Sequence, residues 1–94
     1  MFRSGERRSC GPCDAFLLDA GAERPRAAIV VPRHGRTAVE RNRLKRRLRE
    51  IIRRCWLPVA PPADLVIRAR PAAYAREFGE LRDGIVRGLG LPGC

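Results

Sequence analysis

Half of the cationic side chains in this chain lie in one short window, residues 33–54. The window holds ten of the twenty Lys and Arg residues and only two carboxylates, so it carries most of the formal net charge of +10. All of its cations except one lysine are arginine, whose planar guanidinium group can bind a phosphate through two parallel hydrogen bonds. Such a cluster indicates binding of a polyanion, and a nucleic acid fits it best. The ten cations are Arg33, Arg36, Arg41, Arg43, Lys45, Arg46, Arg47, Arg49, Arg53 and Arg54.

The element that must position these cations is a single amphipathic helix over residues 38–56. Thr37 followed three residues later by Glu40 is a capping box, in which each side chain bonds an exposed backbone N–H at the helix start. Pro58 is expected to end the helix, because proline lacks the N–H that the helical ladder needs. The apolar residues recur at spacings of three, four and seven, which indicates one face packed on a core. They are Leu44, Leu48, Ile51, Ile52, Cys55 and Trp56.

Most of the arginines fall on the opposite side of this helix. At about 100° per residue they form two parallel ridges that face water. Like charges four residues apart repel each other, so an anionic partner is expected along this side. The ridges consist of Asn42, Arg46, Arg49 and Arg53, and of Arg43, Arg47 and Arg54.

Two other interpretations of a basic helix are open at this point. A basic face is often only solvated, and a basic amphipathic helix can also lie on an anionic membrane surface. The apolar stripe carries one bulky aromatic residue, Trp56, near its end. That arrangement is typical of core packing and not of an anchor at a membrane interface, so the residues favour a nucleic acid.

Length and composition limit the remaining possibilities. The 94 residues are expected to form one domain, 1–94. The first ten residues contain no apolar run of the kind found in a signal peptide, and nowhere is there a stretch of about 18 apolar residues that could span a membrane. We therefore expect a cytoplasmic protein, in which the four cysteines are reduced thiols.

Several segments outside the basic window have the pattern of strands. Cys13–Asp19 is a short apolar run between turn residues, and Arg26–Val31 is an apolar run that ends at a proline. Asp64–Arg70 alternates apolar and polar residues, as a half-buried strand does. Glu6–Cys10 could add a short edge strand. Ala20–Arg24 is interpreted as a hairpin turn.

A second helix is expected over Tyr74–Leu89, where Phe78, Leu81, Ile85 and Leu89 recur at helical spacing. Three glycines inside this segment each weaken the helix by up to about 1 kcal/mol relative to alanine, so it needs tertiary support. The order strand, strand, helix, strand, helix predicts an α+β fold. In it, a small and mainly antiparallel sheet of three or four strands packs against the basic helix 38–56 and the carboxy-terminal helix.

The motif Cys10-Gly-Pro-Cys13 is the second pattern that could carry chemistry, as a redox pair or as half of a zinc site. A thioredoxin-type motif has a helix after it, whereas a strand-like run follows here. Zinc would need Cys55 and Cys94 as further ligands, and these do not form a second close pair. The single histidine is not paired with a serine or cysteine in any recognisable pattern. We therefore predict no metal site, no organic cofactor and no catalytic residue in this chain.

The stretch Gly35–Glu50, G-R-T-A-V-E-R-N-R-L-K-R-R-L-R-E, resembles the signature of the bacterial ribonuclease P protein component. That signature is a Gly-x-x-Ala-Val-x-Arg-Asn-Arg-x-Lys-Arg pattern running into a Leu-x-Arg-Glu helix, and it is long and specific. The flanks are similar as well: I-V-V-P-R-H precedes it, and Asp64–Pro71 resembles a strand that ends in Ala-Arg-Pro. Phe2–Gly5 resembles the end of the first helix of the family. The resemblance covers residue 2 to about residue 90.

The resemblance implies a non-catalytic protein subunit that binds a catalytic RNA and the 5′ leader of precursor tRNA. The RNA subunit would remove the leader endonucleolytically, with Mg²⁺ bound mainly by that RNA. Neither a membrane nor a protein partner is implied. A small basic RNA-binding protein of ribosomal type, without a catalytic partner, is the alternative. A cysteine-based zinc or redox protein is a more distant one.

The resemblance also assigns roles to individual residues. Phe16 matches an aromatic residue of the leader-binding cleft and Phe2 matches one on the first helix, although an aromatic residue in an apolar strand is by composition more often part of the core. The remaining predicted RNA contacts come from the signature and from the basic window around it. They are Arg41, Asn42, Arg43, Lys45, Arg46 and Arg49, with Arg33 and Arg53.

The fold that the resemblance implies is ribosomal-protein-S5-domain-2-like, with a left-handed strand–helix–strand crossover through the basic helix. Such crossovers are rare, since nearly all are right-handed. The first helix of the family is expected to be largely absent, which would remove one wall of the leader cleft unless the start of the chain is assigned too late. His34 stands where the family commonly has lysine, so only a partial charge is expected there near neutral pH.

Overall fold

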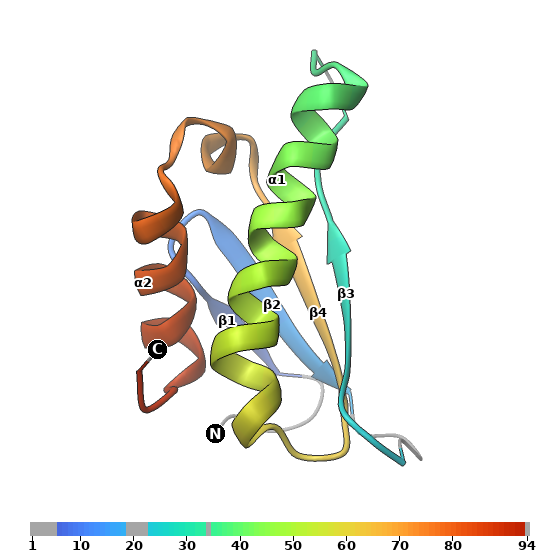
Figure 1. Cartoon of the computed structure of the whole chain (residues 1–94), viewed down its shortest axis with the longest axis vertical. Coiled ribbons are helices and arrows are strands. Elements are labelled where there is room, and N and C mark those ends of the chain that lie inside the picture. Colours follow the sequence, from blue (N-terminus) through green and yellow to red (C-terminus); the bar gives the residue numbers. More distant parts are fainter. Residues whose placement is uncertain (1–5, 19–22, 34, 94) are drawn as a thin grey trace.

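The computed structural model describes residues 6–18, 23–33 and 35–93, which form two layers (Figure 1). One layer is a four-stranded sheet, and the other consists of two helices that cover one face of it. The α+β class is confirmed. In chain order the elements are β1 (Arg7–Ser9), β2 (Cys13–Leu18), β3 (Arg26–Val30), α1 (Ala38–Ile51), the π-helical turn η1 (Ile52–Trp56), the 3-10 turn η2 (Leu57–Val59), β4 (Asp64–Ala69), the 3-10 helix η3 (Pro71–Ala75) and α2 (Phe78–Leu89).

The segment that resembles the first helix of the family falls within residues 1–5. These lie outside the described residues, so the expectation that this helix is largely absent stays a prediction. In the described part of the chain, neither helix has the length and apolarity that crossing a bilayer demands.

The sheet has the order β1-β2-β4-β3, with β3 parallel to β4 and the other two pairs antiparallel. The prediction of a hairpin at Ala20–Arg24 is therefore wrong, because β4 lies between β2 and β3. Apolar alternation marks a strand but does not name its neighbour, which is why the sequence suggested the simpler pairing. The hairpin of the described chain joins β1 to β2 through Cys10–Cys13, with the Cys10 N–H donating to the Cys13 carbonyl at 2.7 Å.

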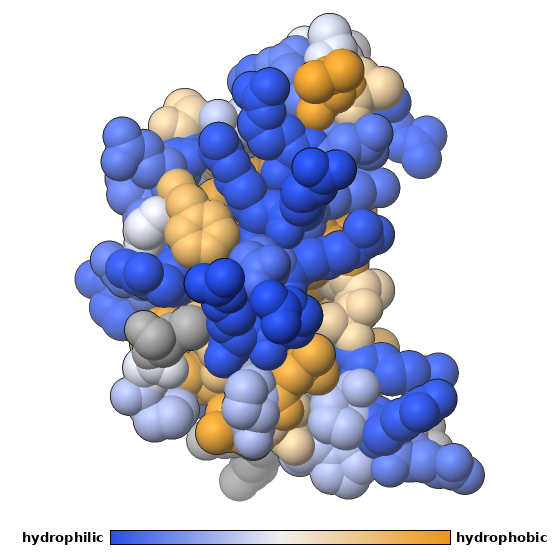
Figure 2. Space-filling model, in the orientation of Figure 1, coloured by the Kyte–Doolittle hydropathy of each residue, from blue (hydrophilic) through white to orange (hydrophobic). Residues whose placement is uncertain are grey.

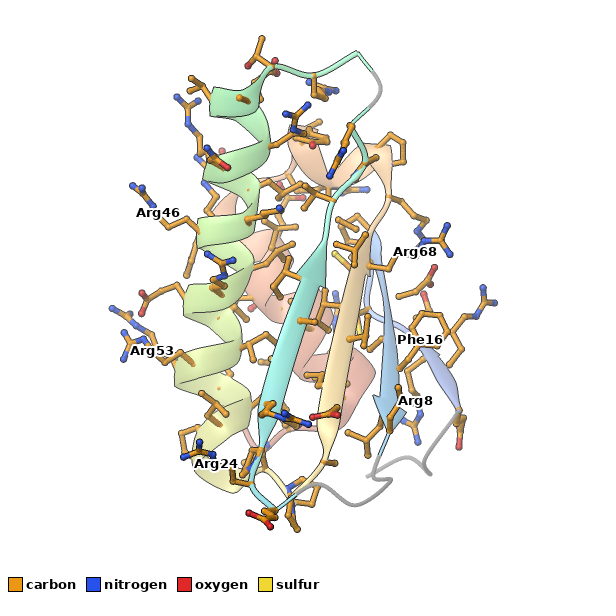
Figure 3. The ribbon with its side chains drawn as sticks, turned by 90° about the vertical axis from the view of Figure 1, so that its right-hand side faces the viewer. Arg8, Phe16, Arg24, Arg46, Arg53 and Arg68 are labelled. Atoms are coloured by element: carbon orange, nitrogen blue, oxygen red, sulfur yellow. The ribbon has the colours of Figure 1, made fainter. Side chains whose placement is uncertain are left out.

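The connection from β3 through α1 to β4 is left-handed. In Figure 1 both strands run upward, α1 lies in front of the sheet, and β4 stands to the left of β3. In Figure 3, which is turned by 90°, α1 lies on the same face of the sheet as it does in Figure 1. A right-handed crossover would put β4 on the other side of β3.

The predicted helical span 38–56 is confirmed, but its last turn is not α-helical and Pro58 does not end it. The α-helix stops at Ile51, and the chain continues through η1 and η2 as far as Val59. Pro58 lies inside the first turn of η2 and does not stop the helical path. A proline is tolerated there because the N–H of a first-turn residue has no acceptor within the helix. At the other end, the capping box of Thr37 and Glu40 is confirmed, with both reciprocal hydrogen bonds at 3.1 Å.

The core lies between the sheet and the two helices. Leu48 and Ile51 of α1 are fully buried in one core cluster with the inward-facing residues of β4, Leu65 and Ile67. Each such side chain contributes roughly 1.5–3 kcal/mol by leaving water. This burial determines which side of α1 faces solvent. The cation-rich side of α1 is therefore exposed to solvent.

Helix α2 approaches the β1–β2 hairpin unusually closely. A Cβ on Gly88 would lie 2.5 Å from Cys10 Sγ and 2.6 Å from the Ser9 carbonyl oxygen, and one on Gly84 would lie 2.9 Å from the Cys10 carbonyl oxygen. Two of the three glycines that weaken the isolated helix, Gly84 and Gly88, are therefore the residues that let it pack. The helix begins at Phe78, later than predicted, because the capping box of Glu77 and Glu80 starts it there.

Candidate nucleic-acid interface

The outward side of α1 carries a run of cations without acidic partners. Arg43, Arg46 and Arg49 are exposed, and Lys45 and Arg47 are half-buried. Across the described residues, no carboxylate lies within ion-pair distance of any of these five. Figure 2 shows the resulting hydrophilic surface over α1. Such a surface suits a polyanion whose phosphates supply the missing counter-charges.

Four of the predicted RNA contacts surround one groove between β3 and α1. The groove has a volume of about 320 Å³. Its polar wall comes from the start of α1 and from the loop before it, and its apolar wall comes from the end of β3 and the residue that follows. The lining residues are Arg33, Arg41, Asn42 and Lys45 on the polar wall and Ile29, Val30 and Val31 on the apolar wall.

A second hollow, of about 420 Å³, lies further round the helix. It shares Asn42 with the first groove, so the two hollows lie on either side of that residue. Val39, which is 66% exposed, gives it an apolar side that the sequence stripe did not predict. Arg43, Arg46 and Arg47 complete it.

The positive charge at the carboxy-terminal end of this helix, on Arg53 and Arg54, is partly neutralised by Glu50. Glu50 Oε1 accepts from Arg54 Nε at 2.7 Å and also from Arg53 Nη2. These bonds lower the pKa of Glu50, chiefly through Arg53 and then Arg54, so the carboxylate stays charged at neutral pH. Arg53, predicted to bind RNA, is thus exposed but already paired. The uncompensated charge is therefore concentrated in the stretch of α1 from Arg43 to Arg49.

The loop before α1 is held by a tyrosine that the sequence did not single out. Tyr74 Oη, from η3, donates to the Pro32 carbonyl at 2.6 Å. The Arg36 guanidinium lies over the Tyr74 ring, 4.3 Å from its centroid, and also pairs with Glu40 at 3.0 Å. These contacts connect the end of β3 and the start of α1 to η3. They thereby position the loop that carries Arg33.

The hydrogen bonds that Glu40 accepts at the start of α1 change the pKa of its carboxyl group. The Thr37 backbone N–H, and then Arg36, lower the pKa of Glu40 below its usual value. A carboxylate whose pKa falls on folding stabilises the fold above its unfolded pKa of roughly 4.3, and this contribution is lost as the pH falls through the folded pKa. At neutral pH the cap is therefore fully charged.

We predict that Tyr74→Phe lowers stability and disturbs the loop. The variant keeps the ring under Arg36 but leaves the Pro32 carbonyl without its donor, which should cost about 0.5–1.5 kcal/mol. For a domain of this size that corresponds to a fall in melting temperature of roughly 4–8 °C per kcal/mol. Thermal unfolding followed by circular dichroism measures it. An unchanged melting temperature would show that the hydroxyl does not hold the loop.

Phe16 lies on the opposite side of the molecule from the cations of α1. It is half-buried on β2, whose alternate residues Cys13, Ala15 and Leu17 point into the core. Figure 3 shows Phe16 and Arg68 projecting from the sheet face that α1 does not cover, while Arg46 projects the other way.

The environment of Phe16 contradicts a purely core role. The register pairs Phe16 with Arg7 of β1 and with Val66 of β4. An aromatic ring with an arginine beside it on an open sheet is a surface on which an unpaired base can stack. Phe2 and His34 lie outside the described residues, so their predicted roles stay predictions.

The Cys10–Cys13 motif has a structural explanation in the described chain. It forms the turn of the β1–β2 hairpin, where Gly11 adopts a φ of +70°. Both cysteines are fully buried, and burial raises the pKa of the Cys10 thiol to about 12 and that of Cys13 to about 11. Thiols in this state are poor nucleophiles. Among the described residues, no three His, Cys, Asp or Glu side chains are grouped to hold a metal; Cys94 is outside them.

Comparison with known sequences gives matches to ribonuclease P proteins. The ribonuclease P family model matches residues 1–90. The ribonuclease P protein component of Acidothermus cellulolyticus is 40% identical over 92 residues, a match that covers 96% of this chain and 77% of that protein. The component from Thermus thermophilus is 47% identical over 64 residues, which cover 68% of this chain. That match spans only 37% of the length of the Thermus protein.

Solved structures agree in fold. The ribonuclease P protein of Thermotoga maritima superposes with a TM-score of 0.70 at 29% identity, covering 87% of this chain and 82% of that one. The Staphylococcus aureus protein gives a TM-score of 0.73 at 21% identity, covering 90% and 69%, which is a likeness of fold alone. With a family match over nearly its whole length and this shared fold, the chain belongs to the ribonuclease P protein family.

Proposed function

We propose that this chain is the protein subunit of ribonuclease P, which binds a catalytic RNA and the 5′ leader of precursor tRNA. The observation that carries the proposal is the helix α1. It presents the family signature on its solvent side, with cations that have no acidic partner among the described residues. The chemistry of leader removal would be performed by the RNA, and the chain would supply binding and orientation.

The cations of α1 would contact the phosphates of the catalytic RNA. Arg41, Asn42 and Lys45 would act with Arg33 around the groove beside β3, since an RNA backbone entering it meets donors on one wall. Arg43, Arg46 and Arg49 would contact phosphates further along, with a smaller contribution from the paired Arg53. Contacts of this kind release counterions, so they produce affinity that depends strongly on salt.

The open sheet face would hold the leader. Single-stranded nucleotides bind proteins by stacking their bases on aromatic rings while cations contact the backbone. Phe16 offers the ring there and Arg7 lies beside it in the register. If α1 contacts one RNA and the sheet contacts the leader, then the chain lies between the two.

Mg²⁺ enters this proposal through the RNA and not through the chain. Folding a catalytic RNA brings phosphates together, and Mg²⁺ neutralises part of their repulsion. Cations of α1 that neutralise further phosphates would lower the Mg²⁺ concentration that the RNA requires.

Reconstitution tests the proposal. The chain is added to a bacterial ribonuclease P RNA and precursor tRNA, and cleavage is measured over a series of Mg²⁺ concentrations. We expect the chain to shift half-maximal cleavage to lower Mg²⁺. RNA binding without any shift would instead identify a basic RNA-binding protein that lacks a catalytic partner.

Single substitutions on α1 should change the salt dependence of RNA binding. Arg46→Ala or Arg49→Ala is expected to reduce the slope of log K against log salt by about 0.9, the value for one phosphate contact with a duplex. Arg76→Ala is the matched control, because Arg76 is exposed but lies before α2 and pairs with Glu80. Filter binding over a salt series measures the slopes. Equal slopes for all variants would contradict the assignment of α1 as the interface.

A further inference from the structure

A groove on the helical side of the molecule is not explained by the contacts assigned above. It lies between α1 with η1 on one wall and α2 on the other, and its volume is about 330 Å³. Figure 2 shows apolar surface between the two helices, bordered by hydrophilic side chains. The groove is lined by Ile51, Arg54, Cys55, Phe78 and Arg82.

The floor and the aromatic side of this groove are rigidly held. Ile51 and Cys55 are buried and belong to the core. Cys55 is disulfide-bonded, so the expectation that all four cysteines are reduced thiols is wrong at this position. Phe78 is the first residue of α2, where the reciprocal capping of Glu77 and Glu80 defines the helix start. It packs against the core but stays half-exposed. A ring in this position presents an apolar surface whose orientation is set before any ligand arrives.

Two guanidinium groups stand on opposite sides of that surface. The side chains of Arg54 and Arg82 are 61% and 41% exposed. Arg54 bonds Glu50 through Nε alone, and among the described residues no acceptor is bonded to its Nη atoms. Arg82 makes only long bonds of 3.4 Å to Asp83. Both groups therefore keep donors for a further anion.

We propose that this groove binds one unstacked nucleotide of the RNA that α1 contacts, with its base on Phe78 and its phosphate between Arg54 and Arg82. An aromatic ring between two arginines matches a nucleotide, which has both a π-face and an anion. The occupant follows from position, because Arg47, which has no acidic partner among the described residues, lies one helical turn before Ile51 of the groove. The inference rests on the proposed function, and it places an RNA contact on the carboxy-terminal helix.

The test separates stacking from packing at Phe78. Phe78→Leu keeps an apolar side chain of similar size but removes the ring, and Phe78→Tyr keeps the ring. Affinity for a bacterial ribonuclease P RNA is measured by filter binding over a salt series, with melting temperatures for each variant. Phe78→Leu is expected to weaken binding about 5-fold or more, since stacking contributes about 1–3 kcal/mol per base. Its salt slope should be unchanged, and Phe78→Tyr should bind within about 2-fold of the parent chain.

Arg82→Gln provides the complementary result. It should reduce the salt slope by about 0.7–0.9, because it removes one phosphate contact. Equal affinity of Phe78→Leu and the parent chain would overturn the proposal. So would equal losses in Phe78→Leu and Phe78→Tyr accompanied by equal falls in melting temperature, which would identify Phe78 as a core residue only.

The same binding assay distinguishes failure of this inference from failure of the proposed function. If Arg46→Ala and Arg49→Ala weaken RNA binding but Phe78→Leu does not, then only the groove assignment is wrong. If none of these variants changes binding, the proposed function itself fails. Cross-linking of RNA that carries 4-thiouridine, followed by peptide mapping, should label residue 78 directly. Absence of that cross-link in an RNA that does cross-link to α1 would also overturn the proposal.

Discussion

Replacing Arg43, Arg46 and Arg49 together by glutamine is expected to weaken RNA binding on the order of 100-fold at about 150 mM monovalent salt. All three side chains are exposed on α1 and have no acidic partner among the described residues. Each lost phosphate contact removes the release of roughly 0.9 counterions, so the slope of log K against log salt should fall by about 2.7. The melting temperature should stay the same or rise slightly, because the variant relieves repulsion between neighbouring arginines.

The control for this variant carries the same change of charge elsewhere. Arg24, Arg76 and Arg87 are also exposed, and none of them belongs to α1. Replacing these three by glutamine should leave the slope within one unit of the parent chain. If both triple variants lost the same affinity, then RNA binding would follow from net charge and not from the arrangement of cations on α1.

Gly88→Ala is expected to destabilise the fold by about 2–3 kcal/mol, although alanine is the better helix former. The added Cβ would lie 2.5 Å from Cys10 Sγ and 2.6 Å from the Ser9 carbonyl oxygen. Cys10 is fully buried in the hairpin turn, so it has no free space into which to move. Helix α2 would have to shift outward, losing contact with the sheet. Chemical denaturation measures the change.

Gly79→Ala is the matched control for this effect. It lies in the same helix, where the nearest atom to an added Cβ is the flexible end of Arg82, at 3.9 Å. Replacement should be neutral or stabilise the fold by up to about 1 kcal/mol through helix propensity alone. Equal effects at the two positions would show that close packing against Cys10 does not limit residue 88.

The parts of the fold that could be predicted are those set by local pattern. The capping box and the apolar spacing located α1 and its buried side, because burial of Leu48 and Ile51 follows directly from a helical period. The strands were placed within a residue or two for the same reason. The end of the helical path was not, because Pro58 is tolerated in the first turn of η2 although it would break a helix interior.

Pairing and long-range contacts could not be predicted in this way. Nothing in a strand's own residues says that β4 lies between β2 and β3, since the contacts that decide it are made by residues 38 to 56 positions apart in the chain. The same holds for the candidate site. Tyr74 and Phe78 looked like helix residues, and only the fold brings one to the loop before α1 and the other to a groove beside it.

The sequence by itself determined that the chain has a cation-rich amphipathic helix, because charge, cap and apolar period are properties of neighbouring residues. It also determined the family, through a signature that runs from the loop before that helix into the helix. Only the tertiary structure decided where the cations point, that Phe16 lies on the opposite face, and why α2 needs glycine at Gly84 and Gly88. Those features depend on which surfaces are buried against one another, and that is a property of the packed chain as a whole.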